Sequence, residues 1–153
     1  MMQRDDAASE PVFTWRVRVY YEDTDAGGVV FYANYLKFFE RARTEWLRHA
    51  GIEQHALTQS AGVMFIVKNT AVDYISPAKL DDELNITVVV QRFGKASVEF
   101  VQQAWRRGPI SDTLLAIGTI KVACVGCQTF RPCAIPSSVR DRLLTIMAAA
   151  TTC

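Results

Sequence analysis

A long amphipathic helix is predicted between Asn34 and Gly51, because apolar residues there recur every three or four positions. Asn34 is suited to the N-cap position, and Gly51 is suited to the position just past the helix end. The apolar face carries mostly aromatic and large aliphatic side chains: Tyr35, Phe38, Phe39, Ala42, Trp46 and Leu47. A face of this kind has to be buried, so the rest of the chain must supply a broad apolar surface.

Strand-like stretches on both sides of this helix can supply that surface. One stretch precedes the helix, from Trp15 to Tyr21, where apolar and charged residues alternate. Four stretches follow it, and a short amphipathic helix follows them: residues 63–76, 83–93, 97–106 and 114–125, then 137–150. Gly94-Lys95 and Gly108-Pro109 indicate hairpin turns. The order predicts an α+β domain in which the later strands form antiparallel meanders and the sheet curls around the long helix.

The composition is that of one globular domain with no strong overall charge. Half of the 153 residues are hydrophobic and the net charge is +1, which argues against nucleic acid or an anionic membrane as a partner. No apolar run is long enough for a transmembrane segment, and residues 1–11 do not have the pattern of a secretory signal. We therefore expect a cytoplasmic protein with a flexible tail over 1–11, one domain over 12–136, and a helix and tail of the same domain over 137–153.

The cysteines predict neither a zinc centre nor a redox motif. Three of the four lie close together in sequence: Cys124, Cys127 and Cys133, with Cys153 apart. Zinc would need about four nitrogen or sulfur ligands, and the two histidines are far upstream. The CxxC spacing closes a strand and leads into a loop, whereas a thioredoxin-like pair opens a helix. We expect reduced, mostly buried thiols, and neither a metal nor a bound cofactor.

The acidic loop over residues 22–28 is the main candidate for chemistry. Asp25 lies there a few residues before the long helix, beside two glycines that allow close approach of a ligand. Amide groups at a helix N-terminus stabilise an oxyanion, and a neighbouring carboxylate can attack a carbonyl group or activate water. Spacing alone equally allows an acidic turn that only caps the helix, and it does not rank Asp25 above Glu22 and Asp23.

Other reaction types lack their sequence signals. The chain has no GxSxG elbow, no phosphate-binding GxxxxGK[ST] and no GxGxxG. His49 and His55 are expected late in the long helix or just after it, away from the end where Asp25 lies. A histidine-based triad is therefore not expected.

Residues 17–30, VRVYYEDTDAGGVV, resemble the hotdog-fold thioesterases of the 4-hydroxybenzoyl-CoA thioesterase family. The likeness continues through Ala33-Asn34-Tyr35 and the segment from Phe39 to Arg43, extends from about Phe13 to Pro136, and is greatest for the bacterial branch encoded with the Tol-Pal envelope system. It implies a curved five-stranded antiparallel sheet around one central helix. It also implies an acyl-CoA thioesterase that needs no cofactor and forms a homodimer or homotetramer with active sites at the subunit interface.

The resemblance also assigns roles to residues. Asp25 matches the catalytic aspartate, a nucleophile or general base, and the backbone amide near Tyr32 matches the group that polarises the thioester carbonyl. Tyr21 matches a tyrosine beside the site. Tyr32 replaces the usual histidine of the Tol-Pal branch, which argues against an imidazole acid or base. Substrate contacts are expected from Gly28, Asn34, Val67, Lys95 and Ser97, and the acyl pocket from Val29, Phe31, Phe65 and Val67.

Two alternatives stay open at this point. One is a hydratase on the same fold, although such enzymes pair a histidine with a carboxylate. The other is a protein that binds acyl-carrier protein or envelope-assembly partners and has weak thioesterase activity. Arg41, Arg43 and Arg48 would then form its basic helix face. Whichever function holds, peripheral association with the inner membrane is also open. The sequence does not indicate the preferred acyl chain length.

Overall fold

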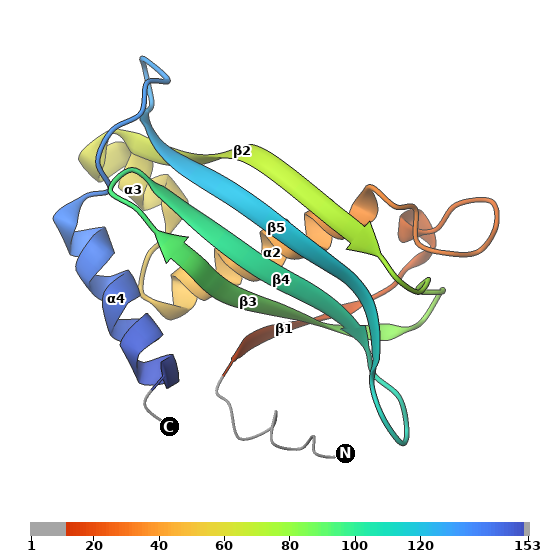
Figure 1. Ribbon diagram of the computed structural model, residues 1–153. Coiled ribbons are helices and arrows are strands. Elements are labelled where there is room, and N and C mark those ends of the chain that lie inside the picture. The colour runs from red at the N-terminus through yellow and green to blue at the C-terminus, as the bar shows by residue number, and fades with distance from the viewer. Residues whose placement is uncertain (1–11, 152–153) are drawn as a thin grey trace.

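The computed structural model describes residues 12–151 as a five-stranded antiparallel sheet that curves around a long helix (Figure 1). The strands are β1 Phe13–Arg18, β2 Val63–Tyr74, β3 Glu83–Phe93, β4 Ser97–Arg106 and β5 Thr113–Gly126. The helices are α2 Asn34–His49, α3 Gln54–Ala61 and α4 Ser137–Thr151, with one 3-10 turn, η1 Tyr21–Asp23. The predictions for residues 1–11 and for Cys153 lie outside the described residues.

The strand order in the sheet is β1-β3-β4-β5-β2. The expected meander holds for β3, β4 and β5, but β2 pairs with β5 at the edge of the sheet and not with β3, so the predicted four-strand meander was wrong there. The connection after β2 explains the crossing. Backbone hydrogen bonds of 2.9 Å join Val19 to both Asp81 and Asp82, so β3 starts beside β1.

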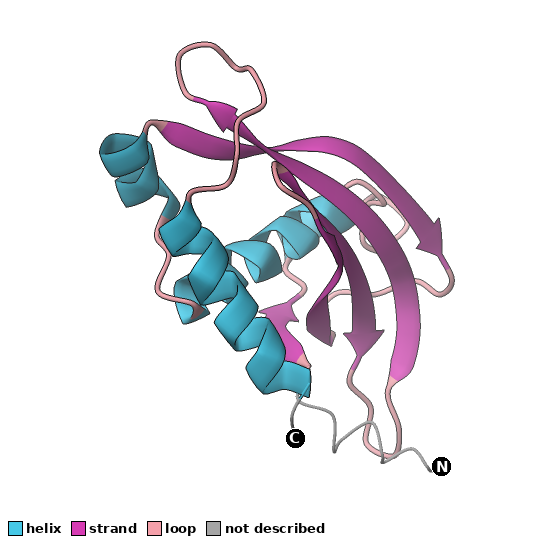
Figure 2. Ribbon diagram, turned by 60° about the vertical axis from the view of Figure 1, so that its left-hand side comes forward, coloured by secondary structure: helices cyan, strands magenta, loops and turns pink. Residues whose placement is uncertain are grey.

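The core lies between α2 and the concave face of the sheet. Phe38, Phe39 and Ala42 on α2 are fully buried, as the helical spacing predicted. Phe39 packs against Gly118 of β5 so closely that a Cβ atom at Gly118 would lie 2.8 Å from the Phe39 ring. This contact lets the helix sit deep in the curve of the sheet, while α3 and α4 lie together near one end (Figure 2).

Several element boundaries differ from the predicted ones. The N-cap of α2 is Ala33, and Asn34 is the first helical residue, because its side chain is turned back to the preceding loop. Strand β1 ends at Arg18, since the chain turns into η1 before Tyr21. Helix α3 was not expected: its one buried side chain is Leu57, so it shows little amphipathic spacing.

The three described cysteines are free thiols at the end of β5 and in the loop after it. Cys124 is buried, whereas Cys127 and Cys133 are half-buried, so burial is less complete than the sequence indicated. The sulfur atoms of Cys124 and Cys133 are 3.8 Å apart. No helix in the described part of the chain is long and apolar enough to cross a membrane.

Candidate active site

The acidic loop forms a small closed structure between β1 and α2. Thr24 and Val30 form an antiparallel bridge, and Asp25 lies at the start of the turn between them. The Asp25 amide donates to the Val29 carbonyl at 2.9 Å, and the Gly28 amide donates to the Asp25 carbonyl at 3.0 Å. Gly28 has a φ of 84°, a backbone conformation that glycine adopts without strain. The loop therefore holds Asp25 by backbone geometry.

Asp23 is the structural carboxylate of this loop. Its side chain is only 7% exposed, and its Oδ2 atom accepts a hydrogen bond of 2.9 Å from the Tyr20 amide. Its carbonyl oxygen accepts from the Phe31 amide at 2.9 Å and from Nδ2 of Asn34 at 2.7 Å. Asp23 thus ties the end of β1 to the start of α2. The same contact engages the Asn34 amide group, whose predicted role in binding substrate stays a prediction.

Asp25, by contrast, is exposed, and only one of its carboxylate oxygens is engaged within the described residues. Its Oδ1 atom accepts hydrogen bonds from the amides of Gly27 at 2.8 Å and Val29 at 3.4 Å. Within residues 12–151 no hydrogen bond or ion pair involves Oδ2. Glu22 is also exposed, but it lies on η1, one turn earlier. The fold therefore gives the three carboxylates different environments, which their spacing in sequence could not show.

The start of α2 provides a backbone donor beside this loop. In the described part of the chain, no hydrogen bond engages the amide of Tyr32, two residues before the helix begins. The Tyr32 carbonyl accepts a hydrogen bond of 2.9 Å from the hydroxyl of Tyr74, at the end of β2. Burial raises the pKa of Tyr74, as does the nearby Tyr32, so the Tyr74 hydroxyl keeps its proton at neutral pH. Sequence reasoning missed Tyr74, which fixes the peptide preceding the helix.

A shallow hollow of about 300 Å³ lies beside this amide. It is lined by the loop, α2 and the end of β2: Val30, Tyr32, Tyr35, Tyr74, Ile75, Ser76 and Pro77. Burial also raises the pKa of Tyr35. The lining is uncharged and mostly apolar or aromatic, so an apolar or thioester group placed there would lie next to Tyr32 and meet no charged side chain.

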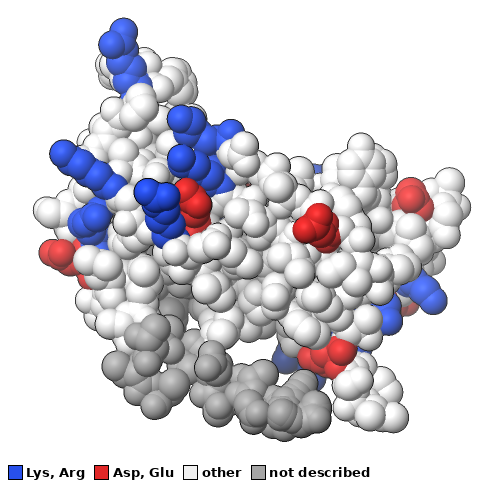
Figure 3. Space-filling view, viewed as in Figure 1, with Lys and Arg blue, Asp and Glu red and all other residues white. Residues whose placement is uncertain are grey.

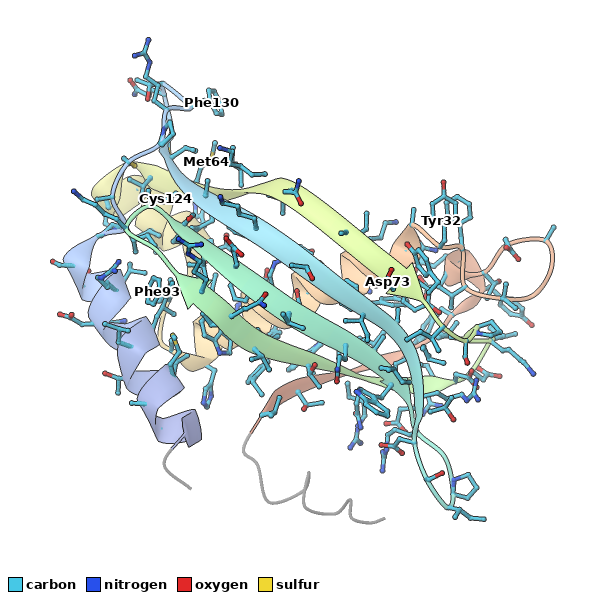
Figure 4. The ribbon with its side chains drawn as sticks, in the orientation of Figure 1. Tyr32, Met64, Asp73, Phe93, Cys124 and Phe130 are labelled. Carbon is cyan, nitrogen blue, oxygen red and sulfur yellow. The ribbon has the colours of Figure 1, made fainter. Side chains whose placement is uncertain are left out.

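The other predicted site residues are spread over the molecule. Tyr21 lies on η1 and is 81% exposed. Lys95 lies in the β3–β4 turn and Ser97 begins β4. Figure 4 labels Tyr32 at one end of the sheet and Phe93, next to that turn, at the other. A single chain thus brings Asp25, Gly28, Tyr32 and Asn34 together but leaves Lys95 and Ser97 at the opposite end.

A deeper cavity of about 250 Å³ lies along the second half of α2. Of the residues predicted for an acyl pocket, Phe65 and Val67 line this cavity, whereas Val29 and Phe31 are not among its lining residues. The walls come from three helices and three strands: Glu40, Arg43, Thr44, Trp46, Leu47, Gln54, Phe65, Val67, Val98, Phe100, Val122 and Leu143. Most of these side chains are apolar, and the polar ones belong to α2 and α3.

One charged group of this cavity is partly buried. Nη1 of Arg43 donates to Oε1 of Gln102 at 2.9 Å, and Nε2 of the fully buried Gln102 donates to the Phe39 carbonyl at 3.0 Å. Burial lowers the pKa of Arg43 to about 10, although nearby Glu40 opposes that effect, so the guanidinium remains charged at neutral pH. Nothing in the sequence pattern distinguished Arg43 from the exposed arginines of the same helix.

Basic side chains gather on the outer face of the sheet at the end away from Asp25 (Figure 3). In the strand register, Arg92 of β3 lies opposite Glu99 of β4, and Glu99 lies opposite Lys121 of β5. Lys95 is exposed in the turn beside them. The cluster carries more positive than negative charge, which suits an anionic group.

Residues 19–143 match the sequence pattern of the Thioesterase-like superfamily. The acyl-CoA thioesterase YbgC of Haemophilus influenzae is 45% identical over 128 residues, which cover 84% of this chain and 91% of the relative. A probable thioesterase from Bartonella henselae, solved as a crystal structure, is 30% identical with a TM-score of 0.75 and covers 82% of this chain and 99% of its own. A crystal structure of a 4-hydroxybenzoyl CoA thioesterase mutant with 4-hydroxybenzoyl CoA is similar in fold, at 18% identity and a TM-score of 0.79, covering 86% of this chain and 98% of that one.

Proposed function

The chain belongs to the Thioesterase-like superfamily, and we propose that it hydrolyses an acyl-CoA thioester to a free acid and coenzyme A. Its fold is the hotdog fold, as the resemblance implied. The observation that carries the proposal is that one short segment before α2 holds an exposed carboxylate, Asp25, and the Tyr32 amide, which no hydrogen bond engages within the described residues. Acyl transfer needs these two groups: one to attack or activate water, and one to stabilise the oxyanion.

The proposed mechanism uses Asp25 and the helix start. The Tyr32 amide donates to the thioester oxygen, where negative charge builds up as the carbonyl carbon becomes tetrahedral. Asp25 either takes a proton from a water molecule that attacks this carbon, or attacks the carbon itself to form an anhydride that water then cleaves. In both routes the carbon–sulfur bond breaks and the CoA thiolate takes up a proton.

We further propose that the working unit pairs two copies along β2. Within the described sheet β2 pairs only with β5, so its outer edge has free backbone groups. Antiparallel pairing about a two-fold axis would place the first half of one β2, with Val67, beside the second half of the other, with Tyr74. Tyr74 contacts Tyr32 near Asp25, so the 250 Å³ cavity of one subunit would adjoin the carboxylate of its partner. That cavity is the proposed acyl site.

The basic cluster of Arg92, Lys95 and Lys121 is the proposed contact for the phosphates of CoA. Ser97, at the start of β4 beside this cluster, would contribute a hydroxyl group. The cluster lies on the outer face of the sheet, whereas Val98, the residue after Ser97, lines the cavity from the inner face.

The two rival functions have less support from the structure. A hydratase would need a histidine near the carboxylate, but His49 packs on Phe13 with ring centres 5.7 Å apart, and His55 lies on α3. The basic helix face expected for an acyl-carrier protein is reduced, because Arg43 is bonded to Gln102 and Arg48 pairs with Glu45 at 2.7 Å. Binding of such a carrier, and association with Tol-Pal proteins or the inner membrane, stay predictions.

Steady-state hydrolysis of acyl-CoAs of several chain lengths tests the proposed function. Asp25→Asn should lower kcat by about a hundredfold or more, because the amide neither attacks nor accepts a proton effectively. Glu22→Gln is the matched control, since Glu22 is an exposed carboxylate on η1, and its kcat should stay within about twofold of the parent. Near-normal kcat in Asp25→Asn, or no hydrolysis by the parent enzyme, would overturn the assignment.

A further inference from the structure

We propose that Leu143, on the C-terminal helix α4, closes the inner end of the acyl cavity and limits the chain length that the enzyme accepts. The inference rests on the proposed function, in which the cavity along α2 holds the acyl group. Leu143 is 1% exposed and lines the cavity, although it comes from the last element of the chain. The sequence pattern gives Leu143 no role beyond its place in the predicted terminal helix.

The cavity has an accessible side and a buried side. Val67 on the edge strand is 49% exposed, and Glu40 on α2 is exposed as well. Across from them, Val98, Phe100 and Val122 of the inner sheet are buried. Leu143 belongs to the buried side, and an extended acyl chain that enters past Val67 would meet apolar surface before it reaches α4.

Helix α4 is fixed at two points, so Leu143 is not on a loose segment. Nη1 of Arg140 donates to the Gly94 carbonyl at 3.1 Å, and its guanidinium lies 4.7 Å from the centre of the Phe93 ring. Figure 4 shows Phe93 at the end of β3 that faces α4. The side chain of Arg142 donates to the Gly51 carbonyl just after α2. These anchors, one at the sheet and one just after α2, hold α4 in the position from which Leu143 lines the cavity.

The size of the cavity gives the expected limit. The cavity is small, at about 250 Å³, so a long acyl chain would fill it and reach Leu143. The parent enzyme should therefore prefer acyl chains that end before Leu143, with kcat/KM falling for longer chains. Truncating Leu143 to alanine would extend the cavity toward α4, and a bulkier side chain would shorten it.

The test measures kcat/KM for saturated acyl-CoAs from four to sixteen carbons. In Leu143→Ala, kcat/KM for the twelve-carbon substrate, divided by kcat/KM for the six-carbon substrate, should rise about tenfold or more. The reason is that one additional methylene group bound in an apolar pocket raises kcat/KM by about tenfold or more. In Leu143→Phe, the preferred length should fall. Leu144→Ala is the matched control, since Leu144 is the next residue on α4 but is 45% exposed, and its length profile should be unchanged.

Each outcome separates this inference from the proposed function. If the parent hydrolyses acyl-CoAs but both Leu143 variants keep the parent length profile, the inference is wrong and the function stands. If no acyl-CoA is hydrolysed by the parent, the proposed function fails first. Circular dichroism and thermal melting verify folding. Should Leu143→Ala unfold, Leu143→Val and Leu143→Phe carry the test, because their opposite changes in volume must shift the preferred length in opposite directions.

Discussion

Alanine substitutions of Asp23 and Asp25, made separately, should have different effects: the first should lower the free energy of unfolding, and the second should lower kcat. Asp23 is almost fully buried, and its carboxylate accepts the Tyr20 amide at 2.9 Å. Removing this acceptor leaves a donor unpaired, which costs about 1–3 kcal/mol of unfolding free energy. For a chain of this size, about 2 kcal/mol corresponds to a fall in Tm of roughly 4–8 °C.

Asp25→Ala removes an exposed side chain whose Oδ1 atom accepts from the Gly27 amide, a donor that water can reach once the carboxylate is gone. Its effect on unfolding free energy should therefore be about 0.5 kcal/mol or less. The proposed mechanism requires the carboxylate, however, so kcat should fall by about a hundredfold or more. The two substitutions should thus have opposite signatures: Asp23→Ala lowers stability and Asp25→Ala lowers turnover.

Urea denaturation followed by tryptophan fluorescence gives the free energies, at one protein concentration so that any subunit association contributes equally. Turnover is measured at a temperature at which both variants are folded. The reasoning is refuted if Asp23→Ala matches the parent in stability, or if Asp25→Ala is the less stable of the two. Equal losses of kcat in two well-folded variants would show that the carboxylates share the chemistry.

Two further predictions follow from hydroxyl and thiol groups. Tyr74→Phe removes the hydrogen bond to the Tyr32 carbonyl and should lower kcat several-fold, with about 0.5–1.5 kcal/mol of stability lost, as kinetics and urea denaturation would show. Burial, together with the neighbouring Cys133, raises the pKa of Cys124 to about 12, so its thiolate form is scarce at pH 8. In native protein, mass spectrometry should find iodoacetamide on Cys127 and Cys133 well before Cys124, and equal labelling would contradict this burial.

The fold was predictable where side-chain spacing determines an element. Strands β3 and β4 have the predicted bounds. The alternation of apolar and polar residues ends at Gly94, and the short turn there leaves few possible registers between the two strands. Helix α2 was equally clear because its apolar face is wide and aromatic. The position of β2 was not predictable, because it depends on contacts between the connection after β2 and Val19, more than fifty residues earlier in the chain.

The candidate site was predictable only in part, for a related reason. Spacing placed three carboxylates in one loop, and the resemblance selected Asp25. What separates it from Asp23 is burial, which arises when the Phe31 amide and the Asn34 side chain close on the Asp23 carbonyl. Tyr74 reaches the site from the far end of β2, and this approach exists only after the sheet has formed. Local sequence therefore shows which chemical groups are present, whereas their burial and hydrogen-bond partners depend on tertiary contacts.

The exposure of Asp25 bears on how many chains the active site needs. A carboxylate in open water is strongly solvated, and electrostatic stabilisation of an oxyanion is far more effective where water is excluded. In one chain the apolar cavity lies beside Val67, away from that carboxylate, and the edge of β2 between them has no partner strand among the described residues. Pairing two copies along β2 would satisfy the edge, cover the carboxylate and supply the pocket in a single contact. We therefore expect the proposed dimer to serve the chemistry as well as to cover a strand edge.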